Sequence, residues 1–356
     1  ETPTQKTTFS ITRNVTPMKH FKRLATLFLF VALLGSMASL EAQNRWSRKV
    51  KDIYYRSAAD NSKQPALVYA PKKAEVKRPL LVALHTWSDD FEQEGGQPLF
   101  GDWCIQNDWF LIHPNFRGKN RTTKALGSDL AVGDIVSAVE YMVETYNVDE
   151  DRIYLTGVSG GGHMALLMAG RHPEIWAGVS AWCGITDIQA WWEQKSADGP
   201  ERYAKEIVRV LGGKPGIDAE ATEGARYRSP LSYLAKAGSV SLDINHGLHD
   251  GRKGSVPFTH SLYAFNRVVE GTDALSQEDI DSFYETQQVP GGEQPKINDP
   301  VYGKRTPVFR KATETCRITI FEGGHEIVHE AALNWLRLQT KGQPTVWEVK
   351  DIIKID

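Results

Sequence analysis

The sequence predicts an α/β fold with a mostly parallel central sheet, helices on both faces and a helical lid insertion. Three observations predict this class. From about Asn44 onward, apolar runs of strand length alternate with amphipathic stretches. Residues 80–84 are continuously apolar, as expected of a central strand that is buried on both faces. At Ser159, a short apolar run gives way to helical spacing within a glycine-rich turn.

The individual elements follow from local patterns along the chain. The helix at 129–146 rests on apolar residues at helical intervals, and the helix after Ser159 ends near Gly170. In chain order, the prediction is a hairpin of residues 51–57 and 66–69, strands at 80–84 and 109–112, a helix at 129–146, a strand at 152–155, the helix after Ser159, and strands at 175–181, 240–244 and 317–321.

Two stretches interrupt this alternation. Residues 187–238 carry several aromatic side chains and are long enough for two or three helices, so they predict the lid. Residues 271–313 are polar and rich in Pro, Gly and Gln, with one short helical pattern near 277–283, and they predict a surface insertion. Together these features predict one domain over residues 44–356.

The segment that begins at Met18 has the three parts of a secretory signal peptide. Basic residues come first, an apolar run at 24–34 follows, and small residues lead to Ala42. The apolar run is short for a membrane span, so the pattern predicts a leader over residues 1–43 that is cleaved near Ala38 or Ala42. A secreted or periplasmic protein without a retained membrane span is therefore expected. An uncleaved N-terminal anchor is the alternative.

Charge and cysteine content narrow the functional classes. The formal net charge of −2 is close to neutral, which argues against a nucleic-acid partner. In an oxidising compartment, three cysteines form at most one disulfide. Their apolar contexts favour buried free thiols over catalytic ones. The cysteines are Cys104, Cys183 and Cys316.

The residues around Ser159 follow a Gly-x-Ser-x-Gly pattern from Gly157 to Gly161. In such a strand-to-helix turn, the glycines let the two elements pass without a Cβ clash, and the serine is held exposed in a strained backbone conformation. The pattern and its flanks make Ser159 the candidate nucleophile. A glycine-rich turn that only joins two elements is the alternative.

A serine hydroxyl needs a general base, and the base needs a carboxylate to orient it. Because loops at the carboxyl ends of parallel strands converge, both partners are expected after later strands. Asp250 follows one such strand, and His325 follows the next and is expected to open a helix. Asp243 and Asp273 are less well placed, and a solvated surface histidine is the alternative for His325. The sequence thus predicts a triad of Ser159, Asp250 and His325.

A metal site is the competing interpretation of these loops. His246, His249, Asp250 and His325 carry donor atoms that suit zinc. The first three crowd one short loop, however, and a metal there would leave Ser159 without a base. The sequence therefore predicts neither a bound metal nor a cofactor.

An acyl-transfer site also needs donors for the oxyanion of its tetrahedral intermediate. The amide of Gly160, directly after the nucleophile, is one candidate. The other is expected in the loop after strand 80–84, from the amide of Thr86 or Trp87. The Trp87 side chain is also a candidate wall of the acyl pocket, with a packed aromatic at the sheet end as the alternative.

With these residues in place, the chain resembles the α/β-hydrolase superfamily, and within it the catalytic domain of prolyl oligopeptidase-type serine hydrolases. The resemblance covers roughly residues 50–340. It implies Ser159 as nucleophile, Asp250 as its orienting acid and His325 as base. The matching segments are 115–118, 151–153, 157–164, 246–250 and 324–325.

Three features depart from the family's pattern. His85-Thr86 stand where the family usually has His-Gly, and Val256-Pro257 follow the aspartate only after the extra residues 251–255. Only a hairpin-length stretch separates the leader from the first core strand, which leaves no room for the β-propeller of such peptidases. Without a propeller, the resemblance points more to esterases than to oligopeptidases.

The sequence therefore predicts an exported serine hydrolase that cleaves carboxylic esters through an acyl-enzyme on Ser159. Its substrate is expected to be a small-molecule or polysaccharide ester, with acetyl and feruloyl esters of polysaccharides as candidates. A peptidase, with Arg117 or Glu326 holding a peptide terminus, is the first alternative. A non-catalytic binding protein on a hydrolase scaffold is the second. The aromatic set behind the substrate prediction is Trp87, Trp182, Trp191 and Trp192, and the candidate substrate-binding residues are Trp87, Arg117, Trp191 and Trp192.

Overall fold

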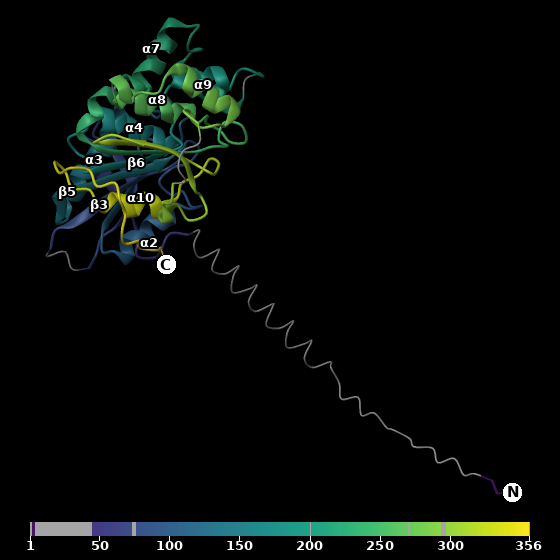
Figure 1. The fold of residues 1–356 in the computed structure, drawn as a ribbon. Coiled ribbons are helices and arrows are strands. Elements are labelled where there is room, and N and C mark those ends of the chain that lie inside the picture. The colour runs from purple at the N-terminus through teal and green to yellow at the C-terminus, as the bar shows by residue number, and fades with distance from the viewer. Residues whose placement is uncertain are drawn as a thin grey trace. The chain divides into compact units, whose positions relative to one another are not determined.

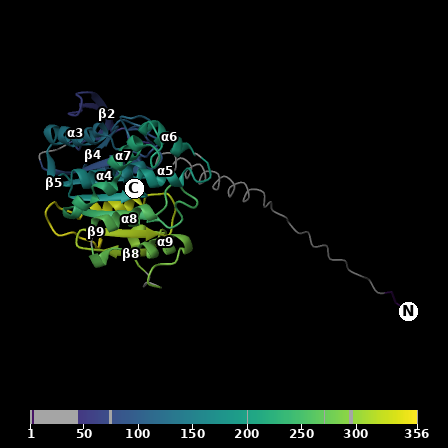
Figure 2. The ribbon, with the colours of Figure 1, turned by 90° about the horizontal axis from the view of Figure 1, so that it is seen from above.

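A central β-sheet organises the fold (Figure 1). The structure, a computed structural model, describes residues 2–3, 45–72, 76–199, 201–269, 271–292 and 297–355. Among these residues, nine strands form one sheet in the order β1-β2-β4-β3-β5-β6-β7-β9-β8. Figure 2 shows β2 near one edge and β8 at the opposite edge. The inner strands pair in parallel, whereas β1, β2 and β8 pair antiparallel at the two edges.

Eight of the nine described strands overlap the segments that the sequence predicts, and β8 is the exception. Their bounds are β1 Lys51–Arg56, β2 Lys63–Tyr69, β3 Arg78–Leu84, β4 Phe110–Pro114, β5 Val148–Val158, β6 Gly178–Trp182, β7 Ser241–Gly247, β8 Pro307–Ala312 and β9 Cys316–Phe321. The α-helices are α2 Pro98–Gln106, α3 Asp129–Thr145, α4 Gly160–Arg171, α5 Ile188–Gln194, α6 Arg202–Leu211, α7 Ala219–Arg228, α8 Thr259–Val268, α9 Gln277–Thr286 and α10 His329–Leu336. Short 3-10 helices lie at Pro230–Ser232, Leu234–Ser239, Gly271–Asp273 and Pro300–Tyr302. The predicted α/β class with a mostly parallel sheet is confirmed.

Helices cover both faces of the sheet. On one face, α3, α4 and α8 pack with Leu80, Val82 and Leu84 of β3. On the other face, α2 and α10 pack with Leu81 and Ala83 of the same strand. Figure 1 shows these two helical layers on opposite sides of the sheet. Burial on both faces explains why this strand is apolar at successive positions.

The segment 187–238 is helical, as the sequence predicts. It contains α5, α6 and α7, whose apolar residues form a small separate core. That core includes Trp87 from the loop after β3 and Val256 from the loop after β7. The lid therefore packs directly on two loops at the carboxyl ends of strands.

Two sequence expectations need correction. Residues 307–312, assigned to a surface insertion, form the edge strand β8, which pairs with β9. An edge strand tolerates a leading proline and polar side chains, so this segment lacks the apolar signature of the inner strands. His325 does not open a helix, because α10 begins at His329. The helical pattern near 277–283 does form a helix, α9.

All three cysteines are free and buried, as predicted. The structure describes positions 2, 3 and 45 of the unit Glu1–Arg45. The predicted signal peptide, which begins at Met18, therefore lies outside the described residues. Within the described part of the chain, no helix is long and apolar enough to cross a membrane.

Candidate active site

Ser159 lies on a strained turn between β5 and α4. Its backbone has φ +60° and ψ −120°, a conformation that a side chain with a Cβ rarely adopts. The Ser159 amide donates to the Trp182 carbonyl at 2.9 Å, which ties the turn to the end of β6. Gly157 is required beside it, because a Cβ there would lie 2.5 Å from the Gly161 carbonyl carbon. The turn thus has the geometry that the glycine pattern predicts.

Asp250 and His325 meet beside this turn. His325 Nδ1 lies 2.5 Å from Asp250 Oδ2, although the two residues are 75 positions apart in the chain. Asp250 is fully buried, whereas 22 % of the His325 side chain is exposed. An Nδ1–H that donates to the carboxylate leaves Nε2 as the acceptor, which is the tautomer that a general base requires.

Asp250 is held as a carboxylate by several donors. Gly251 and Val256 donate their amides to Oδ1 at 2.9 and 3.1 Å, and the His246 ring reaches Oδ2 at 3.0 Å. Burial raises the pKa of Asp250, but the hydrogen bonds from His246 and His325 outweigh burial and hold that pKa well below its usual range. These donors therefore favour the carboxylate form of Asp250 next to His325.

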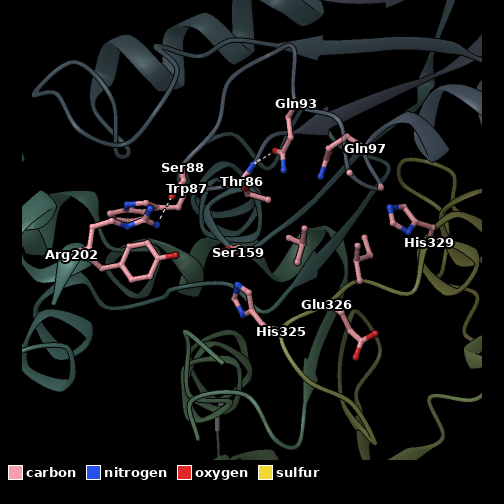
Figure 3. Close-up of a pocket in the computed structure, with 15 residues that line it drawn as sticks. Thr86, Trp87, Ser88, Gln93, Gln97, Ser159, Arg202, His325, Glu326 and His329 are labelled. Atoms are coloured by element: carbon pink, nitrogen blue, oxygen red, sulfur yellow. Dashed lines mark hydrogen bonds between the residues drawn. The ribbon is translucent and has the colours of Figure 1, made fainter. Parts of the chain in front are cut away.

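Ser159 and His325 line the same cavity, which has a volume of about 480 Å³. Both side chains are described, and no hydrogen bond joins the Ser159 hydroxyl to the His325 ring. Such contacts are often long in ligand-free enzymes and shorten when substrate binds. Figure 3 shows the two residues facing each other across the middle of this cavity.

Two backbone amides are available beside Ser159. Gly160 opens α4, so its amide has no partner within the helix. A Cβ on Gly160 would lie 2.4 Å from the Trp87 amide nitrogen, which places the loop after β3 against this helix end. The Thr86 amide instead donates to Gln93 Oε1 at 2.8 Å. Among the described hydrogen bonds none uses the Trp87 amide, so the geometry favours Trp87 over Thr86 as the second donor.

The cavity has two chemically different walls. The first, called here the lid wall, comprises Trp87, Ser88, Arg202 and Tyr203. The second, called here the polar wall, comprises Gln93, Gln97, Glu326 and His329. Figure 3 shows Trp87 and Arg202 on one side of Ser159, and Gln97 and His329 on the other. A substrate that spans the nucleophile therefore meets aromatic and cationic groups at one end and neutral or acidic polar groups at the other.

Several predicted substrate-binding residues lie elsewhere. Arg117 is outside the cavity, because its guanidinium is paired with Asp60 and Asp134 at 2.8 Å each. Trp191 and Trp192 are also absent from the lining; Trp191 packs behind Trp87, with ring centroids 4.8 Å apart. Trp87 itself does line the cavity, and the wholly buried Trp182 does not.

Of the four residues of the metal alternative, His246 and His325 both contact Asp250, whereas His249 lies apart from them. His249 Nε2 lies 2.5 Å from Glu322 and is directed away from Asp250. Within the described residues, the candidate ligand group comprises Cys183, Asp250 and His325. Burial raises the pKa of the Cys183 thiol well above its usual value. The protonated thiol, which contacts the Glu326 carbonyl at 3.4 Å, is a poor metal ligand.

Comparison with protein families agrees with this geometry. The model of the prolyl oligopeptidase family matches residues 110–318, which is more than half of the chain. The chain belongs to the prolyl oligopeptidase family. This match includes Ser159 and Asp250 and stops just before His325.

The curated relatives of this family member include feruloyl and acetylxylan esterases. It is 28 % identical over 163 residues to feruloyl esterase B of Neurospora crassa, covering 43 % of this chain and 51 % of the relative. It is 30 % identical over 127 residues to an acetylxylan esterase of Coprinopsis cinerea, covering 33 % of this chain and 34 % of the relative. The chain thus spans about half or less of the length of these relatives.

A solved structure supports the fold. The acylaminoacyl peptidase of Pyrococcus horikoshii superposes with a TM-score of 0.55 at 14 % identity, covering 88 % of this chain and 44 % of that one. At this identity the likeness concerns the fold alone.

Sequence reasoning missed most of the cavity lining. Arg202 and Tyr203 lie on a lid helix, where no local pattern distinguishes a lining residue from a solvated one. Gln93, Gln97 and His329 lie in or beside the loop after β3 and at the start of α10. These residues belong to no recognisable motif, so the sequence did not mark them as lining residues. Each does follow the carboxyl end of a strand, which is where ligand sites are commonly found.

Proposed function

We propose that this family member is a serine ester hydrolase that forms an acyl-enzyme on Ser159. The observation that carries the proposal is the hydrogen bond from His325 to the buried, ionised Asp250, in a cavity that Ser159 also lines. A nucleophile, a base with a free Nε2 and a carboxylate that orients the base are the groups that acyl transfer requires.

In the proposed reaction, Ser159 Oγ attacks the ester carbonyl carbon while His325 Nε2 takes the hydroxyl proton. The tetrahedral intermediate collapses, the bond to the alcohol oxygen breaks, and His325 returns the proton to the departing alcohol. Water then attacks the acyl carbon while His325 Nε2 takes one of its protons. The second tetrahedral intermediate collapses, the bond to Ser159 Oγ breaks, and His325 returns the proton to Ser159 Oγ as the acid leaves. The amides of Gly160 and Trp87 stabilise the oxyanion of both intermediates.

The lid wall favours an aromatic acyl group over acetyl. A cavity of about 480 Å³ is larger than an acetyl group needs, and it is lined by the half-buried Tyr203 beside the loop that carries the buried Trp87. Similarity to a feruloyl esterase supports a feruloyl-type acyl group on a polysaccharide. The signal-peptide pattern after Met18 supports export of the enzyme to where such polymers occur.

A peptidase is the second candidate function. Family membership supports it, and Glu326 lines the polar wall, where a carboxylate could receive a peptide amino terminus. Glu326 is, however, paired with Arg305 at 2.8 Å, which offsets its charge. An ester substrate needs no such group and is therefore favoured.

A substrate panel tests the proposal. Wild type and Ser159→Ala are compared on nitrophenyl acetate, a methyl ferulate series, feruloylated sugars and aminoacyl amides. We expect ester turnover that is lost in Ser159→Ala and amide turnover that is slower by orders of magnitude. Activity that survives the substitution would remove Ser159 from the mechanism. Amide cleavage that rivals ester cleavage would select the peptidase, and a folded protein that neither turns over esters nor reacts with a fluorophosphonate would select a binding protein.

A further inference from the structure

The lid holds the side chain of Trp87. Trp87 Nε1 donates to Glu206 Oε2 at 2.8 Å, although the two residues are 119 positions apart. Both side chains are buried, with 1 % of Trp87 and 6 % of Glu206 exposed. Because Glu206 lies on α6, this hydrogen bond joins the lid to the loop after β3.

Other contacts brace the same junction. Arg121 is paired with Glu206 at 3.0 Å, and Arg202 approaches the same carboxylate at 3.9 Å. These two cations offset the buried charge of Glu206. Arg202 also donates to Ser88 Oγ at 2.8 Å, the contact dashed in Figure 3. The Trp87 ring packs edge-on against Trp191 and Tyr203, so its orientation is fixed from several sides.

Trp87 also carries the amide that lies against the nucleophile turn. Its amide nitrogen would be 2.4 Å from a Cβ on Gly160, and the neighbouring Thr86 amide is already bound to Gln93. The Trp87 carbonyl accepts from the Asn120 amide at 3.0 Å. Since one residue holds both the indole and the amide, a contact that fixes the indole also limits rotation of the amide.

We propose that Glu206 is a positioning residue for the oxyanion hole. By holding the Trp87 indole, the lid helix α6 keeps the Trp87 amide directed at the oxyanion above Ser159. The inference rests on the proposed function, which supplies that oxyanion. In this role the lid contributes to stabilisation of the transition state as well as forming a wall of the cavity.

Kinetics of Glu206→Ala, Trp87→Phe and the double variant test this role. We expect kcat to fall by about 10- to 100-fold in each, because a displaced oxyanion donor weakens only the transition state. KM should stay within about threefold of wild type. Affinity for a trifluoromethyl ketone, whose serine adduct places an oxyanion in the hole, should fall by the same factor as kcat. The double variant should be no slower than the slower single variant, since both remove one bond.

Two further variants separate positioning from lid structure. Glu206→Gln keeps an acceptor for the indole and should recover most of the lost kcat. Glu223→Ala removes an exposed lid carboxylate that pairs with Arg226 and should behave as wild type. If Glu206→Ala fails to fold, Trp87→Phe still tests the bond, because it keeps an aromatic ring at this position and removes the indole donor.

Three outcomes would overturn the inference: a change in KM without a change in kcat, additive losses in the double variant, or Glu206→Gln as slow as Glu206→Ala. A failure of the proposed function looks different, because Ser159→Ala would then remain active. If Ser159→Ala is inactive while Glu206→Ala and Trp87→Phe retain full kcat, only the role of Glu206 is lost.

Discussion

Different parts of the fold position the nucleophile side and the lid wall of the cavity. Ser159, Asp250 and His325 together are called here the nucleophile side. Ser159, Asp250 and His325 follow the ends of β5, β7 and β9; β7 and β9 are neighbours in the sheet, and β6 lies between β5 and β7. Trp87 and Arg202 instead face the cavity through contacts between the β3 loop and α6. The backbone of a rigid sheet thus sets the proposed chemistry, while side chains from an insertion set the surroundings of the substrate.

The largest effect should come from the nucleophile side. Asp250→Asn replaces an acceptor with an amide that can donate, so His325 loses the tautomer with a free Nε2. We expect kcat to fall by about 10³- to 10⁴-fold, with a similar loss in His325→Ala. The double variant should be no worse than either single one, because the residues act as a unit. Steady-state ester hydrolysis measures these losses.

His249→Ala is the matched control for this prediction. It lies one position before Asp250, but its ring is directed at Glu322. Its kcat should stay within about threefold of wild type, as expected for a surface change. Equal losses in His249→Ala and Asp250→Asn would contradict the assignment of Asp250.

The junction between the two regions should give the next largest effect. In Gly160→Ala, the new Cβ would lie 2.4 Å from the Trp87 amide, so the β3 loop must move away from the nucleophile. We expect kcat to fall by about 100-fold, as when one oxyanion donor is lost. Gly238→Ala, where nothing lies within 4 Å of the added Cβ, is the control. Wild-type kcat in Gly160→Ala would separate the β3 loop from catalysis.

A smaller effect should come from the lid wall. Arg202→Ala removes a guanidinium that lies 4.6 Å from the Tyr203 ring and lines the cavity. We expect KM for a feruloyl ester to rise by about 10-fold with kcat changed much less, which is the signature of lost ground-state binding. Nitrophenyl acetate should be affected less than the feruloyl ester. Arg209→Ala, exposed on the same helix, provides the control, and equal effects on both esters would argue against an aromatic acyl site.

The smallest effect concerns the free energy of unfolding. It tests whether His163, next to the nucleophile turn, is buried away from water in the folded state. Burial lowers the pKa of His163, directly behind the nucleophile turn, to about 4. An unfolded chain has a histidine pKa of about 6.5, so the unfolded state binds more protons between these values. The free energy of unfolding should therefore fall as the pH drops from about 6.5 to about 4.

His163→Gln should reduce this slope by up to about 1.4 kcal/mol per pH unit, because one titrating group is removed. Urea unfolding at several pH values between 7 and 4 measures the slope. The same slope in wild type and variant would show that His163 is accessible to protons in the folded state.

The sequence could predict the residues of the nucleophile side because they follow strands of the sheet. Ser159, Asp250 and His325 each follow a recognisable strand, and the convergence of parallel strands supplies the long-range step. The fold class and most strands follow from apolar runs in the same way. β8 was missed because an edge strand carries polar residues on its exposed side, and α10 begins later than expected because the His325 loop is longer than a simple turn.

The lid wall could not be predicted from local patterns. Glu206 and Arg202 have the helical spacing of ordinary surface residues, and their contacts with Trp87 and Ser88 depend on how α6 packs on the loop after β3. Arg117 illustrates the opposite error: it lies in a segment that resembles the family, yet its ion pairs with Asp60 and Asp134 hold it away from the cavity. Resemblance located the segment but not the direction of its side chain.

The most direct test of the account is to identify the residue that becomes acylated. Wild type is mixed with excess nitrophenyl ester and quenched within the first turnovers, and the intact mass and the peptide masses are measured. The account predicts a burst of one equivalent per chain, with the acyl group on Ser159 and none in Ser159→Ala. Turnover without any acyl-enzyme under conditions of rate-limiting deacylation, or an acyl group on another residue, would contradict it.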